Sequence, residues 1–329
     1  MRLLSLSLAF LLSSFLSLHA DEWRVKNVSL ETENDADIRD DGAYTYGGAL
    51  GILFFREDIN NSLLHIPFTE YKDSDNYISF TIAHQMYTPQ DFESSLLIKE
   101  DRPYAGYLYL QTSLHQSKNS TLKSLSLQVG VVGPSSKMQE VQELIHSLIG
   151  SPDPQGWQYQ LKDEFIFQLN YAQKKYYNLD NIFKYGYNAS IIPEFGIELG
   201  NASIKAYTSA LFRWGKNVPK DYGSFVMDNS NYSKIPLNIK QNGENKKWRY
   251  YLNVGLKTNL IARNIFLDGN SFQESHSVEK NNFLLDITYG LSFAYKRFGI
   301  DYIRRHSSKA FKTQDGYYSY GSLLFSYNY

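Results

Sequence analysis

About twelve segments of alternating apolar and polar residues follow one another along the chain, separated by short stretches of turn-forming residues. This period of two is the pattern of a β-strand whose two faces meet different surroundings. The predicted strands are residues 23–33, 44–55, 77–87, 104–116, 121–132, 158–175, 187–200, 202–214, 248–264, 282–296, 298–306 and 317–329. An even number of antiparallel strands can close into a barrel with both chain ends on one side, which leaves no unpaired strand edge.

The composition indicates what surrounds this barrel. The chain contains 27 Tyr and 20 Phe, and aromatic residues make up 16% of it. Transmembrane β-barrels carry apolar residues outside, polar residues inside and aromatic residues at both membrane interfaces. The last residues, LLFSYNY, end on an aromatic residue, as bacterial outer-membrane barrels do. We therefore predict an all-β protein, a closed antiparallel transmembrane barrel of about 12 strands, with a soluble secreted β-sandwich as the alternative.

The N-terminal segment and the net charge indicate the compartment, the number of domains and the class of partner. Residues 1–20 (MRLLSLSLAFLLSSFLSLHA) have the layout of a cleaved secretory signal, and their apolar run is short for a membrane-spanning helix. Residues 21–329 show no repeat or linker, so we predict a single outer-membrane β-barrel domain. The net charge of -1 argues against a nucleic-acid partner, and the lack of cysteine excludes disulfides.

Residues 132–150 (VGPSSKMQEVQELIHSLIG) predict a helix that ends at Gly150. Its apolar stripe is Met138, Val141, Ile145 and Leu148, and its polar stripe is Gln139, Gln142, Glu143 and His146. With both chain ends periplasmic, this short helix follows the fifth strand and belongs to an extracellular loop. We expect the apolar stripe to pack on the barrel and His146 to turn toward its mouth. A histidine on an exposed stripe is usually only solvated, although imidazole is also the usual general base.

One connection fits this topology poorly. The polar stretch 215–247 follows the eighth predicted strand and would form a long loop on the periplasmic side. Periplasmic connections of such barrels are normally short. Either the strand count slips there, or this loop is an exception.

An acidic stretch, ETENDADIRDDG (31–42), closes the first predicted strand. Its carboxylates and its one amide, which belongs to Asn34, suit a hard cation such as calcium. A solvated acidic loop is the other interpretation. Thr45 opens the second predicted strand and faces the same loop, where its hydroxyl has either a functional or an ordinary structural role.

Several motifs occur in an order that resembles one protein family. Their sequence is END (33–35), YTYGG (44–48), MYTP (86–89), DRPYAGYLYL (101–110), GVVGP (130–134), QEVQELIHSLIG (139–150), a tryptophan at 157 and LDGNSF (267–272). Each motif is weak alone, but their order covers essentially the whole mature chain. The chain thus resembles the outer-membrane lipid A deacylases of the LpxR type.

This resemblance implies a function and a place for it. Such a protein lies in the outer membrane of a Gram-negative bacterium, as a twelve-stranded barrel whose site lies between the wall and helical outer loops. It would hydrolyse the esters of the 3′-linked acyl chains of lipid A, the lipid of lipopolysaccharide, with calcium as cofactor. By motif, His146 corresponds to the general base, Asn34 and Asp35 to residues that hold calcium or organise the oxyanion region, and Thr45 to a site hydroxyl.

Two positions depart from the pattern. Some members carry a lysine in the loop after the third strand, where this chain has Ser94 and Ser95, and the nearest lysine is Lys99. Some members carry a glutamate six residues after the histidine, where this chain has Pro152, and Asp153 is a possible acidic substitute. Two other functions stay open: an outer-membrane phospholipase, and a porin or receptor without enzymatic activity.

Overall fold

The computed structural model describes residues 23–34, 46–56, 66, 74–180, 186–223, 234–237 and 248–329. The long strands are β1 (Arg24–Asn34), β2 (Tyr46–Arg56), β3 (Asp75–Tyr87), β4 (Ala105–Lys118), β5 (Thr121–Val132), β6 (Glu164–Lys175), β8 (Asn188–Gly200), β9 (Ser203–Lys216), β10 (Trp248–Asn264), β11 (Phe283–Tyr295), β12 (Phe298–Ser307) and β13 (Tyr318–Asn328). The short elements are β7 (Tyr177–Asn178), the helices α2 (Met138–Ile149) and α3 (Ile265–Asp268), and the 3-10 turns η3 (Pro134–Ser136) and η4 (Trp157–Tyr159). The predicted signal, residues 1–20, lies outside the described residues.

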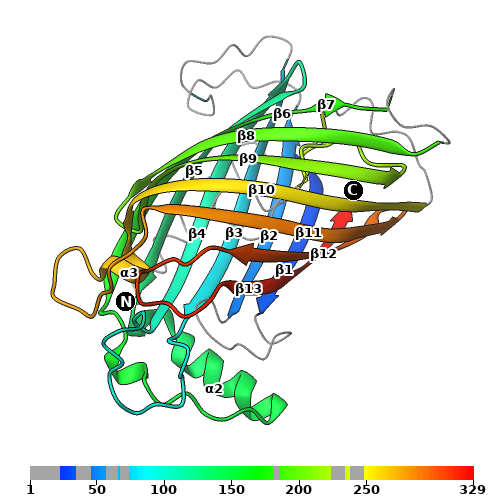
Figure 1. Ribbon diagram of the computed structural model, residues 1–329. Coiled ribbons are helices and arrows are strands. Elements are labelled where there is room, and N and C mark those ends of the chain that lie inside the picture. The colour runs from blue at the N-terminus through cyan, green and yellow to red at the C-terminus, as the bar shows by residue number, and fades with distance from the viewer. Residues whose placement is uncertain are drawn as a thin grey trace.

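The long strands close into a barrel (Figure 1). Each pairs antiparallel with its neighbours, β1 pairs with β13, and β6 pairs directly with β8. All twelve predicted strands are confirmed, and so is the closed antiparallel barrel. One boundary was wrong, because the sixth strand begins at Glu164 rather than at 158, and Trp157–Tyr159 form the turn η4 instead.

The two faces of the wall differ in the way a bilayer requires. Along β11, Phe283 and Leu291 are 57% and 65% exposed on the outer face, whereas Asp286 and Ser292 are buried in the interior. Interior polar groups pair with one another, as when Asn259 Nδ2 donates to Asp286 Oδ2 at 2.9 Å. An apolar outer band around a hydrogen-bonded polar interior is the arrangement of a transmembrane barrel.

The loops distinguish the two ends of the barrel. Tight turns join β4 to β5 and β11 to β12, and they lie at the end where the chain terminates. The opposite end carries the longer connections that contain α2 and α3 (Figure 1). Short periplasmic turns and longer extracellular loops are typical of these barrels, so the end with α2 and α3 is extracellular. Among the described residues, no helix is long and apolar enough to cross a membrane.

The long connection between β9 and β10 is a true exception rather than a miscount, because the strands on both sides keep their order. Its described parts reach lumen-facing side chains near the periplasmic end. The Tyr222 hydroxyl hydrogen-bonds Ser117 Oγ at 2.9 Å, and Lys234 forms an ion pair with Asp301. Protein therefore occupies this part of the lumen, which disfavours an open pore.

We predict that Asp221→Ala destabilises the barrel strongly. Arg213 is 1% exposed, and its Nη1 lies 2.5 Å from Asp221 Oδ1, so the variant leaves a buried guanidinium without its counter-charge. We expect the free energy of unfolding to fall by about 3–5 kcal/mol, measured by urea unfolding in detergent micelles with tryptophan fluorescence. Glu140→Ala, which breaks an exposed pair with Lys137, is the control and should change little. Equal effects of the two variants would contradict this assignment.

Candidate functional site on the outer wall

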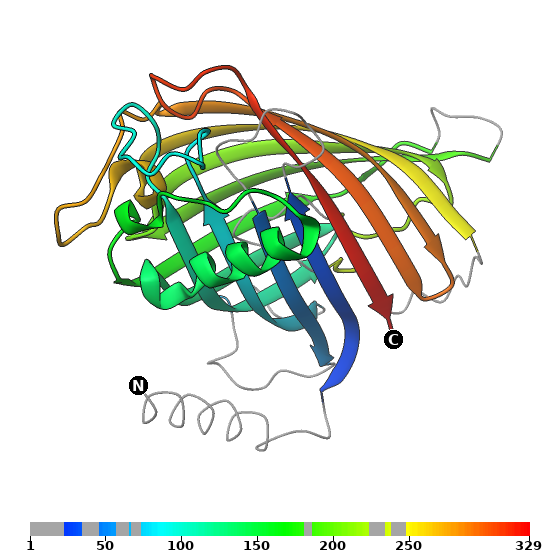
Figure 2. The same cartoon turned by 90° about the horizontal axis from the view of Figure 1, so that it is seen from below.

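Helix α2 lies on the outside of the barrel, across the extracellular ends of β4 and β3 and toward β1 (Figure 2). Met138 and Val141 of α2 pack in one cluster with Met86, which points outward from β3. Gly106 of β4 allows the close approach, because a Cβ there would lie 2.6 Å from Cβ of Met138. The helix and its end at Gly150, which has a positive φ of 73°, are as predicted.

The face that α2 buries is different from the predicted one. Its buried side chains are Met138, Gln142 and His146, whereas Leu148 is 77% exposed. The expectation that the apolar stripe packs on the barrel therefore holds for Met138 and Val141 at the start of the helix and was wrong for Leu148 near its end. His146 does not turn toward the mouth either, because its ring is buried against Phe92 and the Pro152 carbonyl of the neighbouring loops.

The contacts of His146 define its tautomer. Its Nδ1 lies 2.5 Å from the carbonyl oxygen of Pro152, and because a carbonyl only accepts, Nδ1 carries the proton. A neutral ring held in this way leaves the lone pair of Nε2 available as a base. The ring of Phe92 packs edge-on against the imidazole with 5.6 Å between centroids. Tyr104 donates to the Phe92 carbonyl at 2.8 Å, and burial raises the pKa of Tyr104 to about 12, so that donor stays protonated.

Gln142 lies one helical turn before His146 and is 2% exposed. Its Oε1 accepts a hydrogen bond from Trp157 Nε1 at 2.7 Å, which fixes the orientation of the amide. Its Nε2 has no hydrogen-bond partner among the described residues. A buried donor without a partner costs about 1–3 kcal/mol, so this N–H marks a place where a ligand or water would be bound favourably.

Asn34 belongs to the same outer surface. In the register of the sheet, Asn34 of β1 lies opposite Tyr46 of β2, and Tyr46 lies opposite Met86 of β3. Tyr46 packs against the cluster that contains Met86, Met138 and Trp157. Directly opposed residues on neighbouring strands are about 5 Å apart at Cα. Only β2 thus separates Asn34 of β1 from Met86 of β3, on which α2 packs.

Strand alternation divides the acidic stretch at the end of β1. Glu31 and Glu33 are buried on the lumen side, and Glu31 accepts a hydrogen bond from Ser322 Oγ at 2.7 Å. Thr32 and Asn34 alternate with them and face outward. The two glutamates and Asn34 are therefore on opposite faces of the wall and cannot share one cation.

His84 lies in the next row of the outer wall, toward the membrane. It is opposite Gly48, which is opposite Thr32, and the Tyr46 ring is 5.4 Å away. A Cβ at Gly48 would lie 2.5 Å from His84 Nε2, so the glycine makes room for this ring. Nδ1 of His84 has no hydrogen-bond partner among the described residues. A second imidazole therefore faces the membrane side of the candidate site.

The structure does not place the remaining predicted residues beside His146. Asp35 and Thr45 lie outside the described residues, so their roles stay predictions. Asp153 is exposed, and the carbonyl of its neighbour Pro152 takes the place beside the imidazole. Lys99 is exposed in the loop that also contains Phe92.

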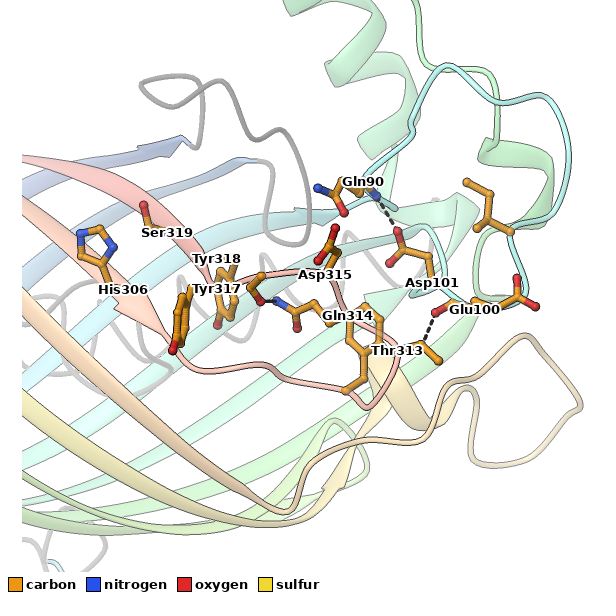
Figure 3. A pocket seen from close by; sticks show the side chains of 13 residues that line it. Gln90, Glu100, Asp101, His306, Thr313, Gln314, Asp315, Tyr317, Tyr318 and Ser319 are labelled. Atoms are coloured by element: carbon orange, nitrogen blue, oxygen red, sulfur yellow. Dashed lines mark hydrogen bonds between the residues drawn. The ribbon is translucent and has the colours of Figure 1, made fainter.

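A cavity of about 660 Å³ lies elsewhere, at the extracellular rim between residues 90–101 and 306–319 (Figure 3). Its two sides are tied together by Thr313 Oγ1, which donates to the Glu100 carbonyl, and the Asp101 carboxylate accepts from Gln90 N at 2.7 Å. None of the predicted site residues that the structure describes lines it. We therefore place the candidate site on the outer wall and not in this cavity.

Sequence reasoning overlooked Gln142, Tyr46 and His84. The pattern contained a signal for Gln142, which shares a helical stripe with His146 and precedes it by one turn. Tyr46 and His84 belong to strands whose pairing had to be known before their common face became visible.

Comparison with known proteins identifies the family to which this barrel belongs. The family model described as "Outer membrane protein LpxR" matches residues 4–329. The chain belongs to the LpxR family. LpxR from Salmonella typhimurium superimposes with a TM-score of 0.73 at 19% identity, over 92% of this chain and 100% of that one. No match was found among curated proteins.

Membership in the LpxR family shows that the protein is a multi-pass β-barrel of a Gram-negative outer membrane. The β domain of the Bordetella autotransporter BrkA is also similar, at 9% identity over 93% of this chain and 97% of that one, but its TM-score is 0.43. That score is too low to support an argument about function. The LpxR family therefore supplies the context in which the outer-wall site is interpreted.

Proposed function

We propose that this protein is a lipid A 3′-O-deacylase, an esterase that acts on the outer leaflet in which it is embedded. The observation that carries the proposal is the buried imidazole of His146, which lies on the lipid-facing side of the wall with its Nδ1 bound to the Pro152 carbonyl. A substrate that is itself a membrane lipid reaches this face laterally, without entering the lumen. An occupied lumen and a base outside it fit a lipid hydrolase better than a porin.

In the proposed reaction, His146 acts as a general base. Nε2 takes a proton from water as the water oxygen attacks the ester carbonyl, and the imidazolium returns a proton to the departing sugar oxygen. The Pro152 carbonyl holds Nδ1–H through both steps and stabilises the charged ring. In this chain a main-chain oxygen thus orients the imidazole and stabilises its charged form, a role that an acidic side chain would otherwise have.

Gln142 supplies a positioned donor in the same proposal. Trp157 holds its Oε1, which leaves the buried Nε2, one helical turn before His146, to donate an N–H. Such a donor can hold the attacking water or stabilise the negative oxygen of the tetrahedral intermediate. A preorganised donor in a site from which water is largely excluded is effective because it needs no reorganisation during the reaction.

Calcium is the proposed cofactor, and the donors available near Asn34 fit it in kind. Amide and carboxylate oxygens, which Asn34 and Asp35 provide, are the hard ligands that calcium prefers, with main-chain carbonyls completing the set. Among the described residues, no group of three His, Cys, Asp or Glu side chains could hold a metal ion. Bound calcium would polarise the ester carbonyl and stabilise its developing negative charge.

The substrate class is tested by offering lipid A and phospholipid to the purified barrel side by side with calcium. We expect fatty acid release from lipid A and none from the phospholipid. Release from phospholipid alone would replace the proposal by an outer-membrane phospholipase, and release from neither substrate would favour a barrel without enzymatic activity.

We predict that Gln142→Leu, which keeps most of the side-chain volume and removes the N–H, lowers kcat by about 100-fold. Purified enzyme and lipid A in mixed micelles provide the measurement. Gln139→Leu, one turn earlier on the half-exposed side of α2, is the matched control and should keep wild-type kcat. An unchanged kcat for Gln142→Leu would remove this side chain from the mechanism.

A further inference from the structure

Helix α2 has three distinct sides. One side, with Gln142 and His146, is buried, and another is polar, where Gln139 Nε2 donates to Glu143 Oε1 at 2.8 Å. The third side is apolar and consists of Val141, Leu144, Ile145, Leu148 and Ile149. Within it, Leu144, Leu148 and Ile149 are 59%, 77% and 66% exposed. Exposed apolar side chains grouped on one side of a helix indicate contact with something other than water.

The direction of this apolar side follows from how α2 lies on the wall. The helix begins near β4 and crosses the outer face of the strands toward β1 (Figure 2). Because an α-helix is right-handed and its Gln142 and His146 side is buried toward the wall, the side with Ile145 and Ile149 faces the periplasmic direction. The side with Gln139 and Glu143 then faces the extracellular water. The apolar side is thus turned toward the membrane.

The outer wall beneath α2 is apolar and exposed as well. Leu30, Leu50 and Ile82 form one row across β1, β2 and β3, and they are 54%, 45% and 47% exposed. This row lies four residues below the row that contains Asn34 and Met86, which is about 13 Å along the strands. The apolar side of α2 is therefore turned toward the lipid-facing band of the barrel.

The charges of α2 agree with this orientation. Lys137 and Glu140 pair at 2.7 Å at the start of the helix, and Glu143 follows one turn later. From Leu144 to Gly150 the chain has no Asp, Glu, Lys or Arg. A helix with one apolar and one polar side lies in the membrane interface with its apolar side about 5–10 Å deep.

We propose that the apolar side of α2 is seated among the acyl chains of the outer leaflet. The helix then lies in the membrane interface, with Gln139 and Glu143 at the level of the head groups. His146, which α2 carries, is held at the boundary between acyl chains and head groups. The seating depends on the amphipathic surface and not on hydrolysis, so it stands even if the protein has another activity.

The absence of cysteine from the chain allows a direct test with single labels. Leu148→Cys and Ser147→Cys are each spin-labelled and reconstituted into vesicles of phosphatidylcholine and phosphatidylglycerol. Collision rates with oxygen, which enters lipid, and with a water-soluble nickel complex report the surroundings of each label. Both residues are exposed and adjacent, but Ser147 lies on the polar side, so it is the matched control.

We expect the label at position 148 to collide mainly with oxygen and the label at position 147 mainly with the nickel complex. A label at 148 that is as accessible to nickel as the one at 147 would overturn the proposal. The heat-dependent shift of a folded barrel in gel electrophoresis verifies that each labelled variant is folded. Because the labels report position rather than turnover, this result is independent of whether lipid A is hydrolysed.

Discussion

Replacing His146 by Ala is expected to lower kcat for lipid A by about 100- to 10,000-fold, the range attributed to a general base. The buried ring has its Nδ1 proton bound by Pro152, and in the proposed mechanism its remaining nitrogen accepts a proton from water. The measurement is fatty acid release by purified protein in mixed micelles. Ser147→Ala, the next residue on the exposed side, should behave as the wild type.

A second substitution separates catalysis from packing. His146→Asn keeps an N–H that can donate to the Pro152 carbonyl and loses the nitrogen that acts as the base. We expect His146→Asn to be as inactive as His146→Ala, while both keep the heat-dependent gel shift of the folded barrel. Activity near the wild-type level in His146→Asn would show that the imidazole only supports the structure.

Removal of calcium is expected to reduce turnover by at least about 100-fold, comparable to the loss of one oxyanion-hole donor in an acyl-transfer enzyme. The measurement is fatty acid release after treatment with a chelator, followed by titration with calcium and, separately, with magnesium. We expect calcium to restore activity and magnesium to do so poorly, because calcium accepts a larger and more flexible set of oxygen ligands.

Asp35→Ala should raise the calcium concentration needed for half-maximal activity. Asp37→Ala, in the same acidic stretch, is the control and should have a smaller effect. Turnover that survives thorough chelation would remove calcium from the mechanism and, with it, the proposed roles of Asn34 and Asp35.

The barrel was predictable from the sequence because apolar and polar residues alternate along each long strand. Residues such as Phe283 and Asp286 face lipid and lumen in turn, and each step of the pattern is visible in the sequence. The split of Glu31 and Glu33 from Asn34 was implied by the same alternation. The strand ends that meet beneath α2 are determined by the order of the strands in the closed sheet. The motifs alone do not give this order.

The buried side of α2 was predicted wrongly for a physical reason. In water, the apolar stripe of a helix is the side that becomes buried. Beside a bilayer, apolar residues such as Leu148 can stay outside, and the polar residues Gln142 and His146 are buried at the proposed site. The bond from His146 to Pro152 was also inaccessible to sequence reasoning, because its acceptor is a main-chain carbonyl, which every residue carries.

In the proposed function, an imidazole on the outer wall promotes cleavage of the acyl esters of a lipid in the same leaflet. The most direct test of this function is the mass spectrum of lipid A extracted from Gram-negative cells that express the wild-type protein or His146→Ala. We expect lipid A that lacks the 3′-linked acyl chains in the first case and fully acylated lipid A in the second. Fully acylated lipid A in cells with folded wild-type protein and calcium present would contradict it.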